Sequence, residues 1–339
     1  MATEGETINL SGIVSETKRI INAHSRHFLA LSLIFLLPIS FFITIYPTLL
    51  LQLQSSFNNN LPYPETLFNT LNPSPNQPFK PLVAPIIFSI FVALFSVSAV
   101  ATITYSTIYG FYGRPVRLGS AIKSLMRSIL PLVFTALCVL FLVSLIALVL
   151  GSGFYAVSVL VSFFGVNVEY GSGCFNWMVG VFVFGLVLVL FYLQVHCTLG
   201  FVVVVVESKW GFEALRRSGD LIKGMRLVSL WLLLFGCVTV VFPLWLNSVP
   251  LVRFEGGFDF WKSAGFVAQT VLSSSFVTLF MLISISANAV LYMYCKAFHG
   301  ELASEIAEEF ARDYVSLPFD DDKVPGNTHY CRGLFLTEH

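Results

Sequence analysis

Charged residues are scarce in this sequence, and their scarcity excludes an ordinary soluble fold. Only 11% of the 339 residues are charged, whereas a soluble domain carries about 25%. Hydrophobic residues make up 56% of the chain, and the mean hydropathy is +0.81. The apolar residues stand in runs of about 20 to 30, long enough for a helix to cross a ~30 Å hydrocarbon core. The composition therefore predicts an all-α integral membrane protein.

Catalytic and metal-binding sequence patterns are also lacking. The six cysteines show no CxxC spacing, and the six histidines form no HxxxH or HExxH group. No GxSxG nucleophile motif occurs, and Asp320-Asp321-Asp322 lacks the alternation and the closing glutamate of a calcium loop. We therefore expect a non-enzymatic protein with no catalytic residue, no cofactor and no metal. An intramembrane enzyme stays an alternative.

Six apolar runs define the expected organisation, a bundle of about six transmembrane helices with interfacial amphipathic helices. Residues 1–27 are polar and lack a signal-peptide pattern, residues 28–295 form the transmembrane domain, and residues 296–339 form a soluble tail. Pro38 is expected to kink the first span. The stretch from Gln52 to Pro81 is expected to be an irregular loop. The expected spans are 28–51, 82–109, 129–164 (one long helix or one broken at Gly151-Ser152-Gly153), 177–206, 227–246 and 265–294.

The positions of lysine and arginine predict the orientation. If the N-terminus is cytoplasmic, 16 of the 19 basic residues lie on that side, and only Lys80, Arg253 and Lys262 lie opposite. This asymmetry is the positive-inside pattern. We expect both termini in the cytoplasm, in the endomembrane system or the plasma membrane. The net charge of zero gives no indication of a nucleic-acid partner.

Two basic connectors, residues 111–128 and 207–226, are the best candidates for contact with an anionic leaflet. In each, apolar residues recur on one face of a predicted helix and basic residues lie elsewhere, as in helices at the headgroup level. Each basic residue there contributes about 1 kcal/mol to lipid binding. The alternative is that these residues only set the topology. The apolar faces comprise Ile122, Leu125, Met126 and Ile129, and Phe212, Leu215 and Ile222; the candidate headgroup contacts are Arg114, Arg117, Lys123, Arg127, Lys209, Arg216, Arg217, Lys223 and Arg226.

A few polar residues lie inside the predicted spans. Tyr105, His196 and Asn288 are candidates to line a polar passage, and the alternative is hydrogen bonding between helices. No Asp, Glu, Lys or Arg lies deep in a span, where ion-coupled transporters place ionisable groups. In the tail, Leu302, Ile306, Phe310 and Tyr314 predict an amphipathic helix with an acidic opposite face, which is a possible surface for a protein partner.

The second connector resembles a known bacterial pattern. Glu207, Ala214-Leu215-Arg216-Arg217-Ser218, Leu221 and Lys223-Gly224 resemble a pattern in the membrane domain that accompanies some bacterial glycerophosphodiester phosphodiesterases. The whole chain, including Tyr46-Pro47-Thr48-Leu49 and the segment from Cys295 to Leu302, is similar to a plant family of uncharacterised multipass proteins. The resemblance implies a fold but not the phosphodiesterase activity. The bacterial enzymes carry their active site in a separate soluble barrel, and the polar segments of this chain are too short for a barrel of about 250 residues.

These observations favour a protein that organises lipid or partner proteins through its basic connectors and its acidic tail. The alternative function is a transporter or channel for a small or lipidic solute. A weak internal repeat supports that alternative, because a shift of 93 positions places Ala121-Ile122-Lys123 on Ala214-Leu215-Arg216.

Overall fold

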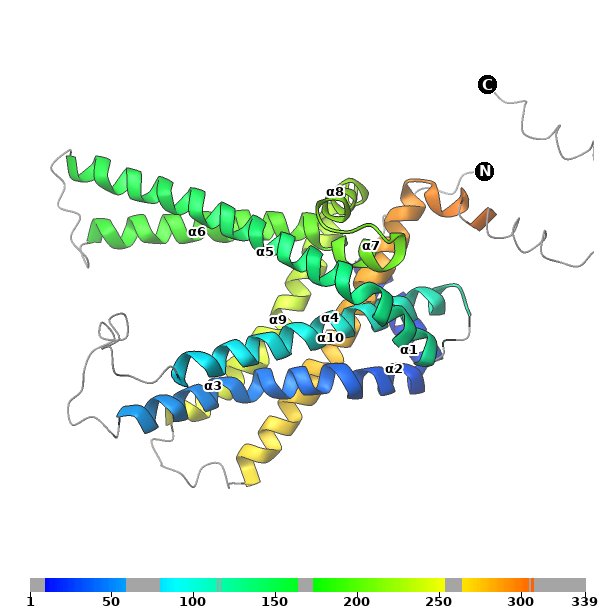
Figure 1. Ribbon diagram of the computed structural model, residues 1–339, viewed down its shortest axis with the longest axis horizontal. Coiled ribbons are helices and arrows are strands. Elements are labelled where there is room, and N and C mark those ends of the chain that lie inside the picture. Colours follow the sequence, from blue (N-terminus) through cyan, green and yellow to red (C-terminus); the bar gives the residue numbers. More distant parts are fainter. Residues whose placement is uncertain are drawn as a thin grey trace, which may run out of the picture. The chain divides into compact units, whose positions relative to one another are not determined.

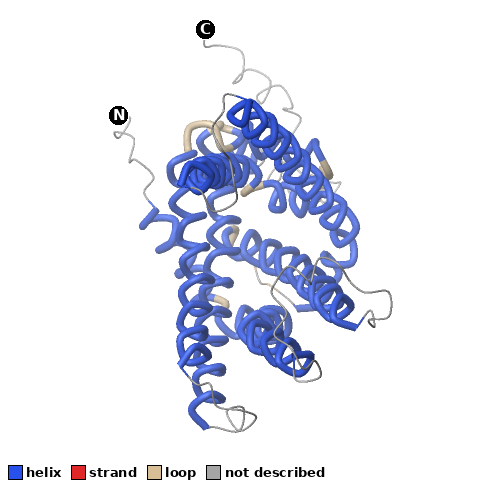
Figure 2. The backbone as a smooth tube through the Cα atoms, turned by 90° about the vertical axis from the view of Figure 1, so that its left-hand side faces the viewer, coloured by secondary structure: helices blue, strands red, loops and turns tan. Residues whose placement is uncertain are grey.

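The computed structural model describes residues 10–58, 80–114, 116, 118–163, 173–253, 264–304 and 306–307. Helices and short turns account for all of these residues, and no strand occurs among them (Figure 2). In chain order the helices are α1 (Leu10–Ala23), α2 (Ser25–Leu31), the π-helical segment η1 (Ser32–Leu36), α3 (Leu37–Asn58), α4 (Lys80–Phe111), α5 (Leu118–Phe163), α6 (Gly173–Cys197), α7 (Gly200–Glu207), α8 (Phe212–Leu221), α9 (Arg226–Arg253) and α10 (Ala264–Phe298) (Figure 1).

Among the described residues, five helical segments are long and apolar enough to cross a membrane. A sixth span is obtained when α9 is taken together with α8, from which it is bent by 115°. The predicted class, an all-α membrane protein with about six spans, is therefore confirmed. The five segments are Ser25–Tyr46, Pro85–Phe111, Leu118–Phe163, Phe175–Glu207 and Gly265–Phe298.

The third span is longer than predicted and is not broken. Helix α5 contains 46 residues and continues through Gly151-Ser152-Gly153, because glycines inside a membrane helix leave its backbone hydrogen bonds intact. At 1.5 Å per residue its length is roughly 69 Å, more than twice the hydrocarbon thickness. The first turns of α5 therefore comprise much of the first connector, and the helix begins eleven residues before the predicted start of the span at Ile129.

Other helices also have bounds that differ from the predicted spans. The span expected at 177–206 consists of α6 and α7, with a short interruption at Thr198 and Leu199. Helix α9 continues to Arg253, beyond the predicted end at residue 246. Helix α3 continues to Asn58 and α4 begins at Lys80, so the ends of the expected loop are helical. Residues 59–79, which include most of that loop, lie outside the described residues.

The helix around Pro38 is disturbed just before the proline. The π-helical segment η1 lies directly before α3, in which Pro38 is the second residue. A proline in a helix lacks its N–H and its ring clashes with the carbonyl four residues earlier. The wider π turn relieves this conflict, because its carbonyls bond to N–H groups five residues on.

Helix α1 was missed by the sequence analysis, which treated residues 1–27 only as a polar segment. Its buried residues Ile13, Thr17 and Ile20 recur every three or four positions, and α1 packs against α4. The approach is close at Gly110, where an added Cβ would lie 2.9 Å from the Cγ2 of Ile20. An amphipathic helix therefore covers the end of α4 that leads into the first connector.

Helix α10 lies at the centre of residues 1–295. Ala287, Val290 and Leu291 are fully buried. Hydroxyl groups of Ser40 in α3 and Thr278 in α10 lie 2.6 Å apart. By contrast, only 6% of the most apolar 18-residue stretch of the α6–α7 span is buried. Such exposure is expected of a helix that faces lipid. The core of the bundle therefore surrounds α10 and not the α5–α6 hairpin.

Residues 296–339 form a separate unit by their contacts. Its described part comprises residues 296–304, 306 and 307. Phe310, Tyr314 and the acidic run at 320–322 lie outside the described residues. The predicted tail helix and its partner surface therefore remain predictions.

Candidate functional site

The turn between α7 and α8 is held against α5 by a buried contact. Helix α7 ends at Ser208 with φ of 55°, and Gly211 has φ of 64° and ψ of −135°. The backbone N–H of Gly211 donates to the Thr135 hydroxyl at 2.9 Å. An added Cβ at Gly211 would lie 2.6 Å from the Cε1 of Phe134. The glycine therefore permits a backbone approach that no other residue allows at this position.

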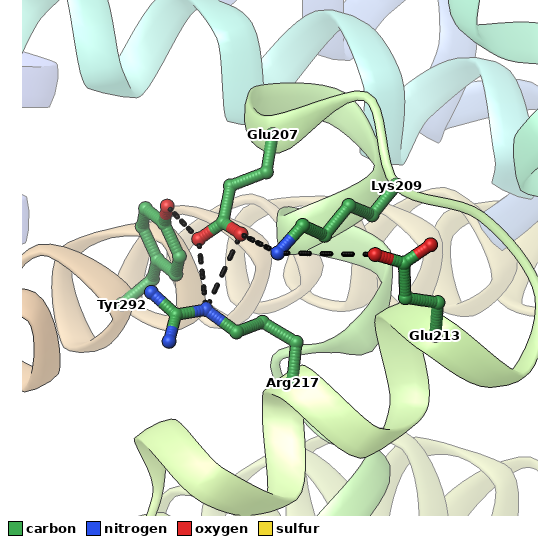
Figure 3. Close-up of polar contacts among 5 residues, drawn as sticks. All are labelled: Glu207, Lys209, Glu213, Arg217 and Tyr292. Carbon is green, nitrogen blue, oxygen red and sulfur yellow. Dashed lines mark hydrogen bonds and ion pairs between the residues drawn. The ribbon is translucent and has the colours of Figure 1, made fainter.

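Three side chains from different segments surround the Glu207 carboxylate (Figure 3). The Tyr292 hydroxyl of α10 donates to its Oε1 at 2.9 Å. Arg217 Nε of α8 lies 3.3 Å from Oε2, and Lys209 Nζ lies 3.5 Å from the same oxygen. The Glu207 side chain is 13% exposed, so these interactions are only weakly screened by water. We call these four residues the Glu207 cluster; it connects α7 and α8 to the central helix.

Helix α8 is fixed on its other side by small residues. The Ser218 hydroxyl donates to the carbonyl of His196 at 2.6 Å. An added Cβ at Gly219 would lie 3.3 Å from the Nδ1 of His196, and Ala214 and Leu221 are buried. The residues that resemble the bacterial pattern are therefore those that build this joint: Glu207, Ala214, Arg217, Ser218 and Leu221.

Carboxylates in the second connector neutralise several of its cations. Arg217 and Lys209 contact Glu207, and Lys223 Nζ lies 2.6 Å from Asp220 Oδ1. The hydrogen bond from Lys223, together with the charge of Lys223, lowers the pKa of the Asp220 carboxyl, so this group is ionised at neutral pH. The exposed cations of this connector are Arg216, Lys223 and Arg226, next to the half-exposed aromatic residues Trp210 and Phe212.

The first connector presents basic residues beside an exposed apolar stripe. In the first turns of α5, Lys123 and Arg127 are exposed. Ile122, Met126 and Leu130 are 44%, 70% and 71% exposed. No acidic residue occurs between Glu65 and Glu169, so the sequence provides no nearby carboxylate from its own segment. This surface, Ile122, Lys123, Met126, Arg127 and Leu130, is named the α5 surface below.

The predicted apolar face of this connector was partly wrong. Leu125 is buried, whereas Ile122 and Met126 are exposed. Residues at i and i+4 form one row on a helix, and residues at i+3 belong to the neighbouring row. The helix face that contains Ala121, Leu125 and Ser128 packs inward. Arg114 is exposed, and Arg117 lies outside the described residues.

The three candidate intramembrane polar residues have different neighbours. The ring of Tyr105 packs against Tyr109 with centroids 4.3 Å apart. His196 packs against Tyr192 and adjoins α8. Asn288 lies in α10, where its Oδ1 is buried and has no hydrogen-bond partner among the described residues. These contacts do not bring the three side chains together into one passage.

The burial pattern of the two connectors agrees with the suggested repeat, although their helices differ. Ala121, Leu125 and Ser128 are buried, and so are Ala214, Ser218 and Leu221, each 93 positions later. In the first connector, however, these residues belong to the same helix as the following span, whereas α8 is bent by 115° from α9. The repeat therefore remains a prediction.

Sequence reasoning missed Glu207 as a site residue. It selected the cations of the connector but not the carboxylate that holds two of them. A signal was present, because Glu207 directly follows the apolar run Val202–Val206, and a carboxylate at a span end requires partners. No group of three or more histidine, cysteine or acidic side chains that could hold a metal occurs in the part of the chain that the structure describes.

Most of the chain matches the model of a known protein family. The model of a family described as a domain of unknown function (DUF8558) matches residues 2–324. The matched residues include every helix from α1 to α10 and both connectors. Neither the curated proteins nor the solved structures gave a match.

Proposed function

The chain belongs to this family of unknown function, and we propose that it is a non-enzymatic membrane protein that binds anionic lipid headgroups through its basic connectors. In this way it organises lipid, or partner proteins, around the bundle. We further propose that both connectors and both termini face the cytoplasm, in the endomembrane system or the plasma membrane. The distribution of 16 basic residues against three supports this orientation.

The α5 surface is the observation that supports headgroup binding best. Met126 and Leu130 are both about 70% exposed in the structure, and a helix at the interface buries such side chains among the acyl chains. Lys123 and Arg127 lie one position along the helix from Ile122 and Met126, and long basic side chains reach the phosphate level from such positions. The surface therefore offers apolar anchoring and positive charge together.

The second connector supports the proposal less strongly. Its exposed Trp210 and Phe212 suit the headgroup level, where aromatic residues are enriched. However, Glu207, Glu213 and Asp220 lie among its five cations, which reduces the net charge available to an anionic lipid. We therefore expect the α5 surface to contribute more to lipid binding than the surface of α8.

The double substitution Lys123→Gln with Arg127→Gln tests the proposal. We expect a rise of at least about tenfold in the apparent Kd, because each cation near an anionic surface contributes about 1 kcal/mol. The measurement is a titration of short-chain phosphatidylserine into the purified full chain in detergent, followed by native mass spectrometry. Raised salt is expected to weaken binding to the unchanged protein.

A matched control, Lys80→Gln with Arg253→Gln, removes two cations that are predicted to lie on the other side of the membrane from the connectors. This variant loses the same charge and is expected to keep the Kd of the unchanged protein. Equal Kd values for all three proteins would refute lipid binding by the α5 surface. The basic residues would then only set the topology.

A further inference from the structure

Two contacts define how α9 packs against α10. Met225 Sδ, just before α9, lies 3.6 Å from Cys295 Sγ in α10. Eleven residues later in α9, an added Cβ at Gly236 would lie 3.2 Å from Ser284 Oγ, which is eleven residues earlier in α10. The two helices are therefore antiparallel, with the same register at both contacts.

The residues between these contacts lie in the same seam. Positions at i+4 and i+7 from a contact residue share its face of a helix. On α9 these are Ser229 and Leu232, and on α10, counted from Ser284, they are Asn288 and Leu291. Ser229 is fully buried, and Leu232 and Leu291 are at most 1% exposed. These three residues are therefore closed to solvent, whereas Asn288 is partly buried.

Two polar atoms in the seam have no partner among the described residues: Ser229 Oγ and Asn288 Oδ1. By the register, Ser229 is level with Leu291 and Asn288 with Leu232. Their backbones are thus offset by three residues, roughly 4.5 Å along the helix axis. Buried polar groups are nearly always hydrogen-bonded, to protein or to ordered water.

We propose that a water molecule binds in the α9–α10 seam and bridges these two side chains. The water donates one hydrogen bond to Asn288 Oδ1 and accepts one from the Ser229 hydroxyl. Water suits both groups because it donates and accepts. This site lies between α9 and the central helix, directly after the second connector, and it does not depend on the proposed lipid binding.

The alternative partner for Ser229 lies within its own helix. A serine hydroxyl in a helix commonly donates to the carbonyl four residues earlier, which here is Met225 O. That carbonyl already accepts the Ser229 N–H at 3.1 Å. If Ser229 turned to it, the two seam residues would be energetically independent. Coupling between them therefore distinguishes the two arrangements.

The test is a double-mutant cycle with Ser229→Ala and Asn288→Leu, measured by thermal unfolding of the purified full chain in detergent. With a bridging water, each single substitution leaves the other polar group with a broken bridge, so each lowers the Tm. The equilibrium constant for unfolding is expected to rise about tenfold in each single variant, and hardly further in the double variant.

Ser286→Ala provides the control. Ser286 Oγ is also buried with no partner in the described residues, but it lies two positions from Asn288, roughly 200° around the helix. Its effect is expected to add to that of Asn288→Leu. Additive effects of Ser229→Ala and Asn288→Leu on stability, in either direction, would overturn the water bridge.

A high-resolution experimental map gives a second readout if Asn288→Leu does not fold. Density for a water within hydrogen-bond distance of both side chains supports the proposal. A direct hydrogen bond between Ser229 and Asn288, or a hydroxyl that donates to Met225 O, contradicts it.

Discussion

Replacing Gly211 with alanine is expected to destabilise the protein by about 4 kcal/mol, the sum of a backbone term and a packing term. The backbone term arises because φ of 64° with ψ of −135° is a conformation that residues with a Cβ rarely adopt. Holding such a residue there costs about 1–3 kcal/mol. Its N–H must also stay in place, because it donates to Thr135.

The packing term arises from Phe134. A Cβ at Gly211 would lie 2.6 Å from the Phe134 ring and 3.6 Å from Cys138 Sγ. Forcing an added carbon into a packed site costs about 1–3 kcal/mol. The loop between α7 and α8 would have to move away from α5, and the Glu207 cluster beside it would be disturbed.

Gly113→Ala separates the two terms, measured for both variants by thermal unfolding of the purified protein. Gly113 has φ of 68°, but nothing lies within 4 Å of its added Cβ. It therefore carries the backbone term alone, and we expect the smaller loss, about 1–2 kcal/mol. Adding Phe134→Leu to Gly211→Ala is expected to recover part of the packing term. Equal losses for Gly113→Ala and Gly211→Ala would refute the close approach of this loop to α5.

Replacing Glu207 with alanine is expected to cost about 2–4 kcal/mol, somewhat below the loss for a fully buried ion pair. The substitution removes the acceptor of the Tyr292 hydroxyl and the carboxylate beside Arg217 and Lys209. Tyr292 is fully buried, whereas the side chains of Arg217 and Lys209 are 25% and 39% exposed. Water can therefore solvate the two cations in part, but not the tyrosine.

Glu213→Ala is the matched control for Glu207→Ala. Glu213 is also near Lys209, at 4.0 Å, but its side chain is 66% exposed. Removing it is expected to change stability by less than about 0.5 kcal/mol. The loss of stability for Glu207→Gln is expected to lie between those for Glu207→Ala and Glu213→Ala, because an amide oxygen can still accept a hydrogen bond from Tyr292 but carries no charge. Urea unfolding of the detergent-solubilised variants measures the three losses of stability and so their order. Similar losses for Glu207→Ala and Glu213→Ala would show that the cluster does not join α8 to α10.

The architecture could be predicted because it depends on local properties of the chain. Long apolar runs with few charges predict helices that cross a membrane. The runs correspond to α2 with η1 and α3, to α4, to α5, to α6 with α7, to α9 and to α10. The boundaries were less predictable. No sequence signal ends a helix between Leu118 and Ile129, so the basic turns there continue into the span as α5.

The site was harder to predict because it depends on contacts between distant segments. Glu207 and Tyr292 are 85 residues apart, and Thr135 and Gly211 are 76 apart. Periodicity places Ile122 and Leu125 on neighbouring rows of a helix, but only the position of α4 against α5 decides which row is buried. A list of cations likewise cannot show that Arg217 is directed to a carboxylate while Arg216 is exposed.

The orientation of the two basic connectors is the claim on which the proposed function depends most directly. Helix α4, between residues 59–79 and the first connector, is long and apolar enough to cross the membrane once, and Tyr292 near the end of α10 contacts Glu207 of the second connector. An epitope tag inserted after Asn69 should therefore lie on the side opposite to a tag after His339. Antibody staining of cells, with and without selective permeabilisation of the plasma membrane, measures this. We expect antibody to reach the tag after His339 from the cytoplasm, but not the tag after Asn69. Antibody that reaches both tags from the cytoplasm would contradict the proposed orientation.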